Sequence, residues 1–150
     1  MHITVKKFPE LTVEELYEIL RLRSEVFVVE QDSVYQDLDD KDQKATHFFV
    51  KDEEEVVAVL RVLEKGEYFS DAVTIGRVVV KEVFRKEGLA GRLLKEAISF
   101  VWEELRETDI KIAAQSRLIP FYKKYGFTPV SEEYILDTIL HTDMILQKEK

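Results

Sequence analysis

The 150-residue sequence has no cysteine and little glycine or proline, with five and three residues respectively. Without cysteine the chain cannot form a disulfide, a thiolate metal site or a cysteine-bound acyl intermediate. No apolar run approaches the roughly 18 residues that span a bilayer, and the first residues lack the basic-then-apolar order of a secretory signal. We therefore expect a cytoplasmic protein that does not enter a membrane.

The formal net charge of −8 is the next constraint. This charge repels polyphosphate backbones and argues against general binding to nucleic acid, although a local basic patch can still hold one phosphorylated ligand. With 45% hydrophobic and 35% charged residues, the composition is that of an ordered globular protein. The length predicts one domain that covers residues 1–150.

Hydrophobic periodicity predicts both strands and helices. Thr12 and Glu15 have the spacing of a capping box at the start of a helix, and Pro9 ends the strand before it. The order is β-α-β-β-β-α-β-α-β-β, over residues 2–8, 12–29, 45–50, 56–63, 72–80, 89–105, 109–114, 118–125, 127–130 and 141–146. The predicted fold class is α/β (α+β), with a mixed, mostly antiparallel sheet flanked by helices.

The most informative window follows the third strand of the predicted meander. Val78, Val79 and Val80 end that strand, and Gly88 and Gly91 then lie at the start of a helix. Free amide groups and the helix dipole favour an anion there, and nearby basic residues add positive charge: Arg85, Lys86 and Arg92. The turn suits a pyrophosphate, unless Gly88 only punctuates a loop beside solvated basic side chains. Neither a Walker motif nor a dinucleotide fingerprint fits it.

Two motifs in this order resemble those of the GNAT acyltransferase superfamily. Arg85-x-x-Gly88-x-Ala90 is similar to the element by which these enzymes hold the CoA pyrophosphate. The segment from Gln115 to Phe127, with Phe-Tyr followed by Gly-Phe, resembles the second signature. Further segments resemble the ElaA-type branch and extend the similarity over nearly the whole chain. Gln115 and Leu118 depart from the superfamily, where many members have Asn and Ala.

The resemblance implies an acetyl-CoA-dependent N-acetyltransferase that transfers acetyl directly to an amine in a ternary complex. In that case Tyr122 is the general acid that protonates the leaving thiolate, although a packing tyrosine is the alternative. The residues expected to contact CoA are Val78, Val79, Val80, Arg85, Lys86, Glu87, Gly88, Leu89, Ala90, Gly91, Arg92, Gln115 and Tyr122. A GNAT fold that binds acyl-CoA without turnover, as a sensor or docking module, is the competing hypothesis.

The acceptor side is less defined. Candidate bases or water-positioning groups are Glu30, His47 and His141, although both histidines also fit buried strand positions. Candidate acceptor-binding residues are Gln31, Tyr35, Asp37, Asp39 and Arg77. The acidic stretch over residues 30–44 either attracts a cationic amine or is a solvated loop. It lacks the ligand pattern of an EF-hand, and we infer no metal. The acceptor is a small-molecule or peptide amine, and a homodimer is possible.

Overall fold

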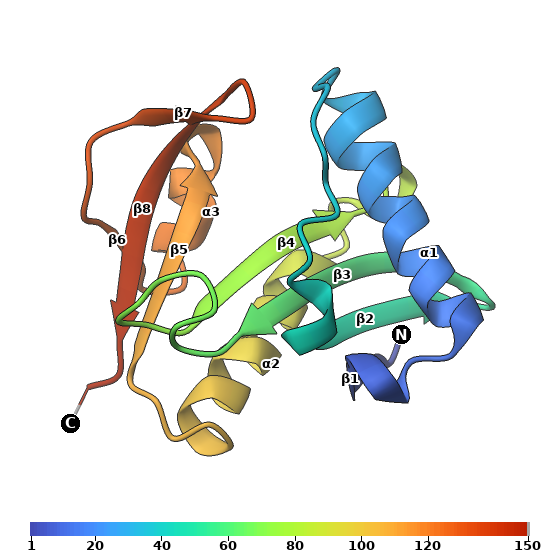
Figure 1. Cartoon of the computed structure of the whole chain (residues 1–150), viewed down its shortest axis with the longest axis horizontal. Coiled ribbons are helices and arrows are strands. Elements are labelled where there is room, and N and C mark those ends of the chain that lie inside the picture. Colours follow the sequence, from blue (N-terminus) through green and yellow to red (C-terminus); the bar gives the residue numbers. More distant parts are fainter. Residues whose placement is uncertain (150) are drawn as a thin grey trace.

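The strands form two antiparallel sheets (Figure 1). The computed structural model describes residues 1–149. The first sheet has the order β1 (Ile3–Lys7), β2 (Thr46–Asp52), β3 (Glu55–Leu63) and β4 (Thr74–Val80). The second has the order β5 (Asp109–Gln115), β8 (Ile139–Gln147) and β6 (Thr128–Pro129), and β7 (Tyr134–Leu136) also pairs with β8. The predicted fold class is confirmed, but periodicity missed β7 and the division into two sheets.

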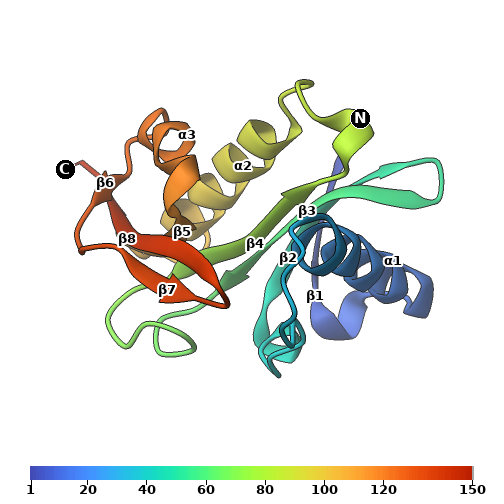
Figure 2. The same cartoon turned by 90° about the horizontal axis from the view of Figure 1, so that it is seen from above.

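The first sheet carries a helix on each face (Figure 2). The helix α1 (Val13–Arg23) packs through Ile19 and Leu22 on one face, and α2 (Leu89–Glu103) packs through Leu93 and Leu94 on the other. This double coverage explains why β3 is a nearly continuous apolar run whose residues from Val56 onward are all buried. The predicted capping box is confirmed, since the Thr12 hydroxyl accepts from the Glu15 amide at 3.0 Å and the Glu15 carboxylate accepts from the Thr12 amide at 2.9 Å.

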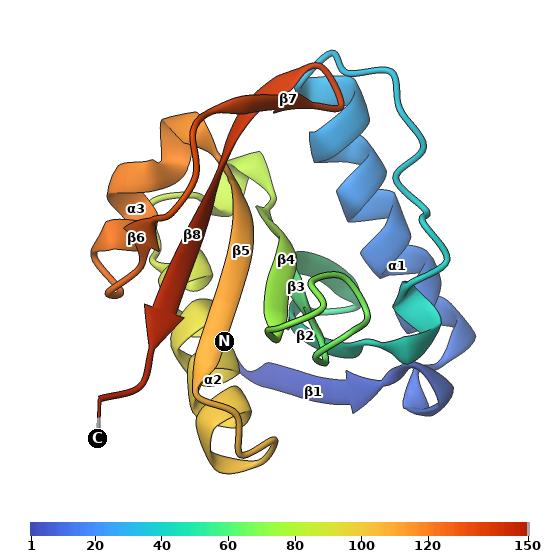
Figure 3. The ribbon, with the colours of Figure 1, turned by 60° about the vertical axis from the view of Figure 1, so that its left-hand side comes forward.

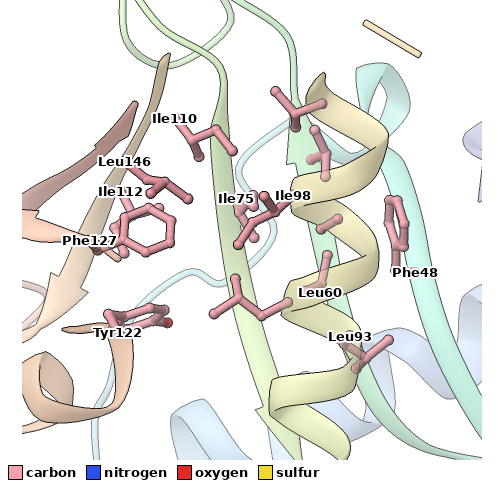
Figure 4. Packing of buried hydrophobic residues seen from close by; sticks show 14 of the residues in the cluster. Phe48, Leu60, Ile75, Leu93, Ile98, Ile110, Ile112, Tyr122, Phe127 and Leu146 are labelled. Carbon is pink, nitrogen blue, oxygen red and sulfur yellow. The ribbon is translucent and has the colours of Figure 1, made fainter. Parts of the chain in front are cut away.

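One hydrophobic core joins the two sheets through α2 (Figure 4). Phe48 and Leu60 contribute from the first sheet, and Ile110 and Ile112 contribute from β5. Tyr122 and Phe127, which belong to the second predicted motif, are members of this same core. The motif is therefore packed directly against the helix that follows the Gly88 loop.

The two sheets meet at one point and then diverge. Val73 forms an isolated parallel bridge with Ile110, and its carbonyl oxygen accepts from the Lys111 amide at 2.9 Å. Beyond this bridge, no strand within residues 1–149 pairs with the outer edge of β4. Backbone amide and carbonyl groups of that edge therefore face a notch between β4 and β5, where a ligand can pair with them.

The remaining segments are short. The predicted helix over residues 12–29 is α1 followed by a π-helical segment, η2 (Ser24–Glu30), whose wider turn is often found at functional sites. The helix α3 (Ile119–Lys123) is preceded by a 3₁₀ turn, η5 (Ser116–Leu118). Other 3₁₀ turns are η1 (Phe8–Glu10), η3 (Asp42–Lys44) and η4 (Glu82–Phe84).

Candidate active site

A cavity of about 380 Å³ lies in the notch between β4 and β5. Twelve of the predicted site residues line it: Glu30, Gln31, Tyr35, Arg77, Val78, Val79, Val80, Arg85, Ala90, Gln115, Tyr122 and His141. The other nine do not line it: Asp37, Asp39, His47, Lys86, Glu87, Gly88, Leu89, Gly91 and Arg92. The structure thus brings together residues from both motifs and from the segment that follows α1.

A β-bulge shapes the β4 wall of the cavity. Val59 pairs with Val79 and Arg61 pairs with Gly76, so one residue of β3 lies opposite two residues of β4. Within the bulge, Arg77 has the left-handed φ of +53°, a strained conformation for a residue with a side chain. The bulge bends the strand where it must leave β5, and it directs the Arg77 side chain to the segment after η2.

The loop before α2 is open and free of negative charge at the helix start. Gly88 is the N-cap residue of α2 with φ +77°, no side chain caps the helix, and its first turn has no acidic residue. A Cβ atom at Gly88 would meet nothing within 4 Å. The amides of the first turn are therefore available to an anion, while Lys86, Glu87 and Arg92 lie exposed around them.

Gly91 has a packing role, and its predicted contact with CoA stays a prediction. A Cβ atom at this position would lie 2.0 Å from the Tyr125 hydroxyl oxygen. The residue is buried and does not line the cavity. Leu89 is likewise a core residue, with 4% of its surface exposed. The second glycine of the motif is needed so that α2 and the end of α3 can pack closely.

Arg85 and Glu30 are paired with each other across the mouth of the cavity. The guanidinium donates to both Glu30 carboxylate oxygens, at 2.6 and 2.9 Å, and its Nε donates to the Val80 carbonyl at 3.0 Å. Both side chains are partly exposed. A phosphate that binds Arg85 must compete with Glu30.

Gln115 connects the end of β5 to the segment after η2 on the opposite side of the cavity. Its side-chain amide nitrogen donates to the Gln31 side-chain oxygen at 3.2 Å. Its own side-chain oxygen is buried and has no hydrogen-bond partner among the described residues. A buried acceptor of this kind is costly unless a ligand donates to it, so the site is suited to an amide N–H.

Tyr122 projects from α3 into the bottom of the notch. The side chain packs against Phe121 and Phe127, with ring centroids 5.1 and 5.9 Å away, and only 7% of the residue is exposed. Burial raises the pKa of Tyr122 to about 12. The hydroxyl thus stays protonated at neutral pH and is available as a proton donor.

His141 lies opposite Gln115 in the β5–β8 ladder. Its Nδ1 is 2.8 Å from the Ile139 carbonyl oxygen, which can only accept, so Nδ1 carries the proton in the neutral ring. The ring stacks on Tyr134, with centroids 6.1 Å apart. Because this tautomer leaves Nε2 unprotonated and His141 lines the cavity, Nε2 can accept a proton there.

His47 lies elsewhere, and the structure does not support its predicted role as a base at this site. The residue is 1% exposed within β2, and its Nε2 is 2.9 Å from the Asp42 carbonyl oxygen. Burial lowers the pKa of His47, with the Arg23 and Arg61 charges acting in the same direction. The buried strand histidine considered as the alternative is the correct description.

Three carboxylates of the acidic stretch after η2, those of Asp37, Asp39 and Asp42, belong to an ionic network, whereas Asp32 and Asp40 are exposed as expected of a solvated loop. Arg23, 1% exposed, reaches Asp37 at 2.8 Å and Asp42 at 2.7 Å. Arg77 reaches Asp37 at 2.8 Å, and Arg61 pairs with both Asp39 and Asp42. Despite partial burial, Arg61 and Arg77 hold the pKa of Asp39 well below its usual range. These carboxylates are neither solvated nor free to attract an amine.

Several residues of the cavity escaped the sequence analysis. Among them are Tyr68, Arg117 and three residues of the β7–β8 hairpin, Leu136, Asp137 and Ile139. The hairpin turn is tied to the opposite wall by Ser33, whose hydroxyl donates to the Asp137 carbonyl at 2.9 Å (Figure 3). The sequence did contain a signal for this hairpin. Short apolar runs lie on either side of Asp137-Thr138, and that pattern is typical of a hairpin.

Comparison with solved structures defines the class. A crystal structure described as an acyl-CoA N-acyltransferase from Pseudomonas aeruginosa superposes with a TM-score of 0.90 at 35% identity, covering 97% of this chain and 99% of the other. The E. coli ElaA crystal structure gives the same TM-score at 34% identity, covering 98% of this chain and all of the other. The protein is therefore an acyltransferase in fold and class.

Sequence comparison then names the family. Residues 8–148 match the family model for the acetyltransferase (GNAT) domain. Protein ElaA of Escherichia coli strain K12 is 36% identical over 137 residues, which are 90% of this chain and 89% of ElaA. An uncharacterized N-acetyltransferase of Bacillus subtilis, YjcF, is 30% identical over 88% of this chain and 92% of its own length. The chain belongs to the GNAT acetyltransferase family, in its ElaA-like branch.

Residues 1–149 contain neither a membrane-spanning helix nor a cluster of metal ligands. No helix in this range has the length and apolarity of a bilayer-spanning segment. No group of three or more histidine, aspartate or glutamate side chains in the same range is arranged to hold a metal ion.

Proposed function

We propose that the protein transfers the acetyl group of acetyl-CoA directly to an amine in a ternary complex. The observation that carries the proposal is that a protonated tyrosine hydroxyl, Tyr122, and an unprotonated imidazole nitrogen, that of His141, line the same cavity. An acid and a base on one cavity are what an acyl transfer to an amine requires. The cavity also has the size of a small-molecule site.

The residues present fit acetyl-CoA at three places. The unpaired edge of β4 offers main-chain groups to the pantetheine arm, and the buried Gln115 oxygen offers an acceptor to one of its amides. The open first turn of α2, beside Arg85, suits the pyrophosphate. When bound, acetyl-CoA supplies a thioester, which an amine can attack without a covalent enzyme intermediate.

The two side chains divide the proton transfers. As the new C–N bond forms, His141 Nε2 accepts the proton that the amine loses, directly or through one water. As the C–S bond breaks, Tyr122 donates its hydroxyl proton to the departing sulfur. The burial that raises the pKa of Tyr122 also disfavours a charged thiolate in the same cavity. Proton transfer from Tyr122 to the departing sulfur therefore avoids leaving a buried negative charge on it.

Replacing Tyr122 with Phe tests the proposal. Thiol release from acetyl-CoA should fall by about a hundredfold or more, the usual size of a general acid contribution, while acetyl-CoA affinity stays near normal. Because the pKa of Tyr122 is about 12, wild-type activity should show no falling limb up to pH 10 or so. Both are measured with a thiol reagent across a panel of amines.

Tyr125→Phe is the matched control, because it removes a hydroxyl three residues further on that does not line the cavity. Wild-type turnover in Tyr122→Phe would refute the acid role. Acetyl-CoA binding by the wild type without thiol release for any amine would favour the non-catalytic alternative.

A further inference from the structure

One carboxylate on the cavity wall has no cation beside it. Glu30 is paired with Arg85, and Asp37 and Asp39 are paired with arginines of the buried network. Asp137 also lines the cavity, yet it forms no ion pair with any described residue. Its negative charge is thus the one on this wall that remains available to a ligand.

The position of Asp137 is fixed by the hairpin turn. Asp137 and Thr138 have φ of +50° and +69°, as in the two-residue turns that join antiparallel strands tightly. Ser33, 2% exposed, holds the turn from the opposite wall by hydrogen bonds of 2.9 Å to the Asp137 carbonyl and the Thr138 hydroxyl. The turn therefore lies beside the segment after η2, as the ribbon in Figure 3 shows.

Two tyrosines lie on the same side of the cavity, Tyr35 and Tyr68. Burial is the main cause that raises the pKa of each, and the Asp137 charge acts in the same direction on both. Tyrosine faces attract cations, and an unpaired carboxylate adds to that attraction. This end of the cavity is therefore chemically suited to a positively charged group.

The distance between Asp137 and the reacting groups decides which positively charged group of a ligand Asp137 can bind. His141 pairs with Gln115, and the turn residues Asp137 and Thr138 precede His141 by four and three residues, so at the rise of an extended strand the turn lies about 10 Å from His141. A carboxylate beside the attacking amine would also keep that amine protonated and unreactive. Asp137 is thus placed for a second cationic group and not for the nitrogen that is acetylated.

We propose, building on the amine acetylation argued above, that Asp137 binds a second cationic group of the acceptor. The substrate class is then a diamine, or an amine with a remote cation, in an extended conformation. Arg117, which lines the same cavity and forms no ion pair with a described residue, defines the competing prediction, an acceptor with a remote carboxylate.

The kinetic test compares three acceptors of equal chain length with wild type and Asp137→Asn: an α,ω-diaminoalkane, an alkyl monoamine and an ω-amino acid. In Asp137→Asn, the KM for the diamine should rise about tenfold, while the KM for the monoamine stays within about twofold. Added salt should raise the diamine KM of the wild type more than that of the variant. Glu133→Gln is the control, since it removes one carboxylate near β7 that does not line the cavity.

Calorimetric titration of the diamine into the CoA-loaded protein separates this proposal from the proposed function. Diamine binding that weakens in Asp137→Asn, without any acetylation, would support the subsite and refute the acetyl transfer. Acetylation with the same diamine KM in both proteins would overturn the subsite and leave the transferase intact. A lower KM for the ω-amino acid than for the diamine would also overturn it, in favour of Arg117.

Discussion

The two walls of the cavity are made of different parts of the chain. The wall at β4 and α2 presents main-chain groups and an open helix start, from one continuous stretch of sequence. The opposite wall consists of side chains from η2, the segment after it, β5 and the β7–β8 hairpin. The first wall needs only the right backbone path, whereas the second depends on buried charges that hold separate segments together.

Arg23→Met should have the largest effect, because it breaks the side-chain wall. The substitution leaves Asp37 and Asp42 buried with fewer positive partners, which typically costs about 3–5 kcal/mol in the free energy of unfolding. Arg21→Met is the matched control on the same helix, where exposed pairs with Glu18 and Glu25 contribute about 1 kcal/mol or less. Urea unfolding measures both, and equal losses would show that the network does not support this wall.

The two glycines of the main-chain wall should respond differently. Gly91→Ala meets the Tyr125 hydroxyl and should destabilise the fold by about 1–3 kcal/mol, with partial rescue by Tyr125→Phe. Gly88→Glu meets open space, although the φ of +77° strains any side chain there by about 1–3 kcal/mol; compared with Gly88→Ala, which carries the same strain, its negative charge should abolish the thermal shift by acetyl-CoA, worth about 2.7 kcal/mol at 100 times the dissociation constant. A normal acetyl-CoA shift in folded Gly88→Glu would remove the anion site from this wall.

Substitution of Glu30 or Arg85, which join the two walls at the surface, should have the smallest effect, a change in acetyl-CoA affinity. Glu30→Gln releases Arg85 and should tighten acetyl-CoA binding a few fold, in line with the roughly 1 kcal/mol of an exposed pair. Arg85→Gln should weaken it. Titration calorimetry gives the affinities, and turnover gives a second result: a large loss of kcat in Glu30→Gln would restore Glu30 as the base.

The main-chain wall could be predicted from sequence because its signals are local. The signals lie close together in the sequence: three valines, then a basic loop, then Gly88 before a helix. Backbone conformation follows from short patterns of this kind. Local reasoning did not reveal the packing role of Gly91, since the Tyr125 hydroxyl that excludes a side chain there comes from the turn after α3. The sequence indicated that the glycine at position 91 matters, but it did not show that the Tyr125 hydroxyl is the cause.

The contacts that hold the side-chain wall together could not be predicted, because the residues that form them are far apart in sequence. The pattern of Asp37, Asp39 and Asp42 is that of a solvated loop unless one knows that Arg23, Arg61 and Arg77 surround it. His47 and His141 have similar strand contexts, and only the fold shows that one is buried outside the cavity and the other lines it. Asp137 was missed because β7 is three residues long.

The single bridge between the sheets bears on how the chain folds. In the first sheet, β2, β3 and β4 follow one another in sequence and pair with their neighbours, so their contacts close short loops. The bridge from Val73 to Ile110 closes a much longer loop, through β4 and α2, and contacts of that kind form against a greater loss of chain entropy. The notch therefore exists only once both halves of the chain have folded, and a fragment that ends before β5 lacks the part of the side-chain wall that β5 and the β7–β8 hairpin supply.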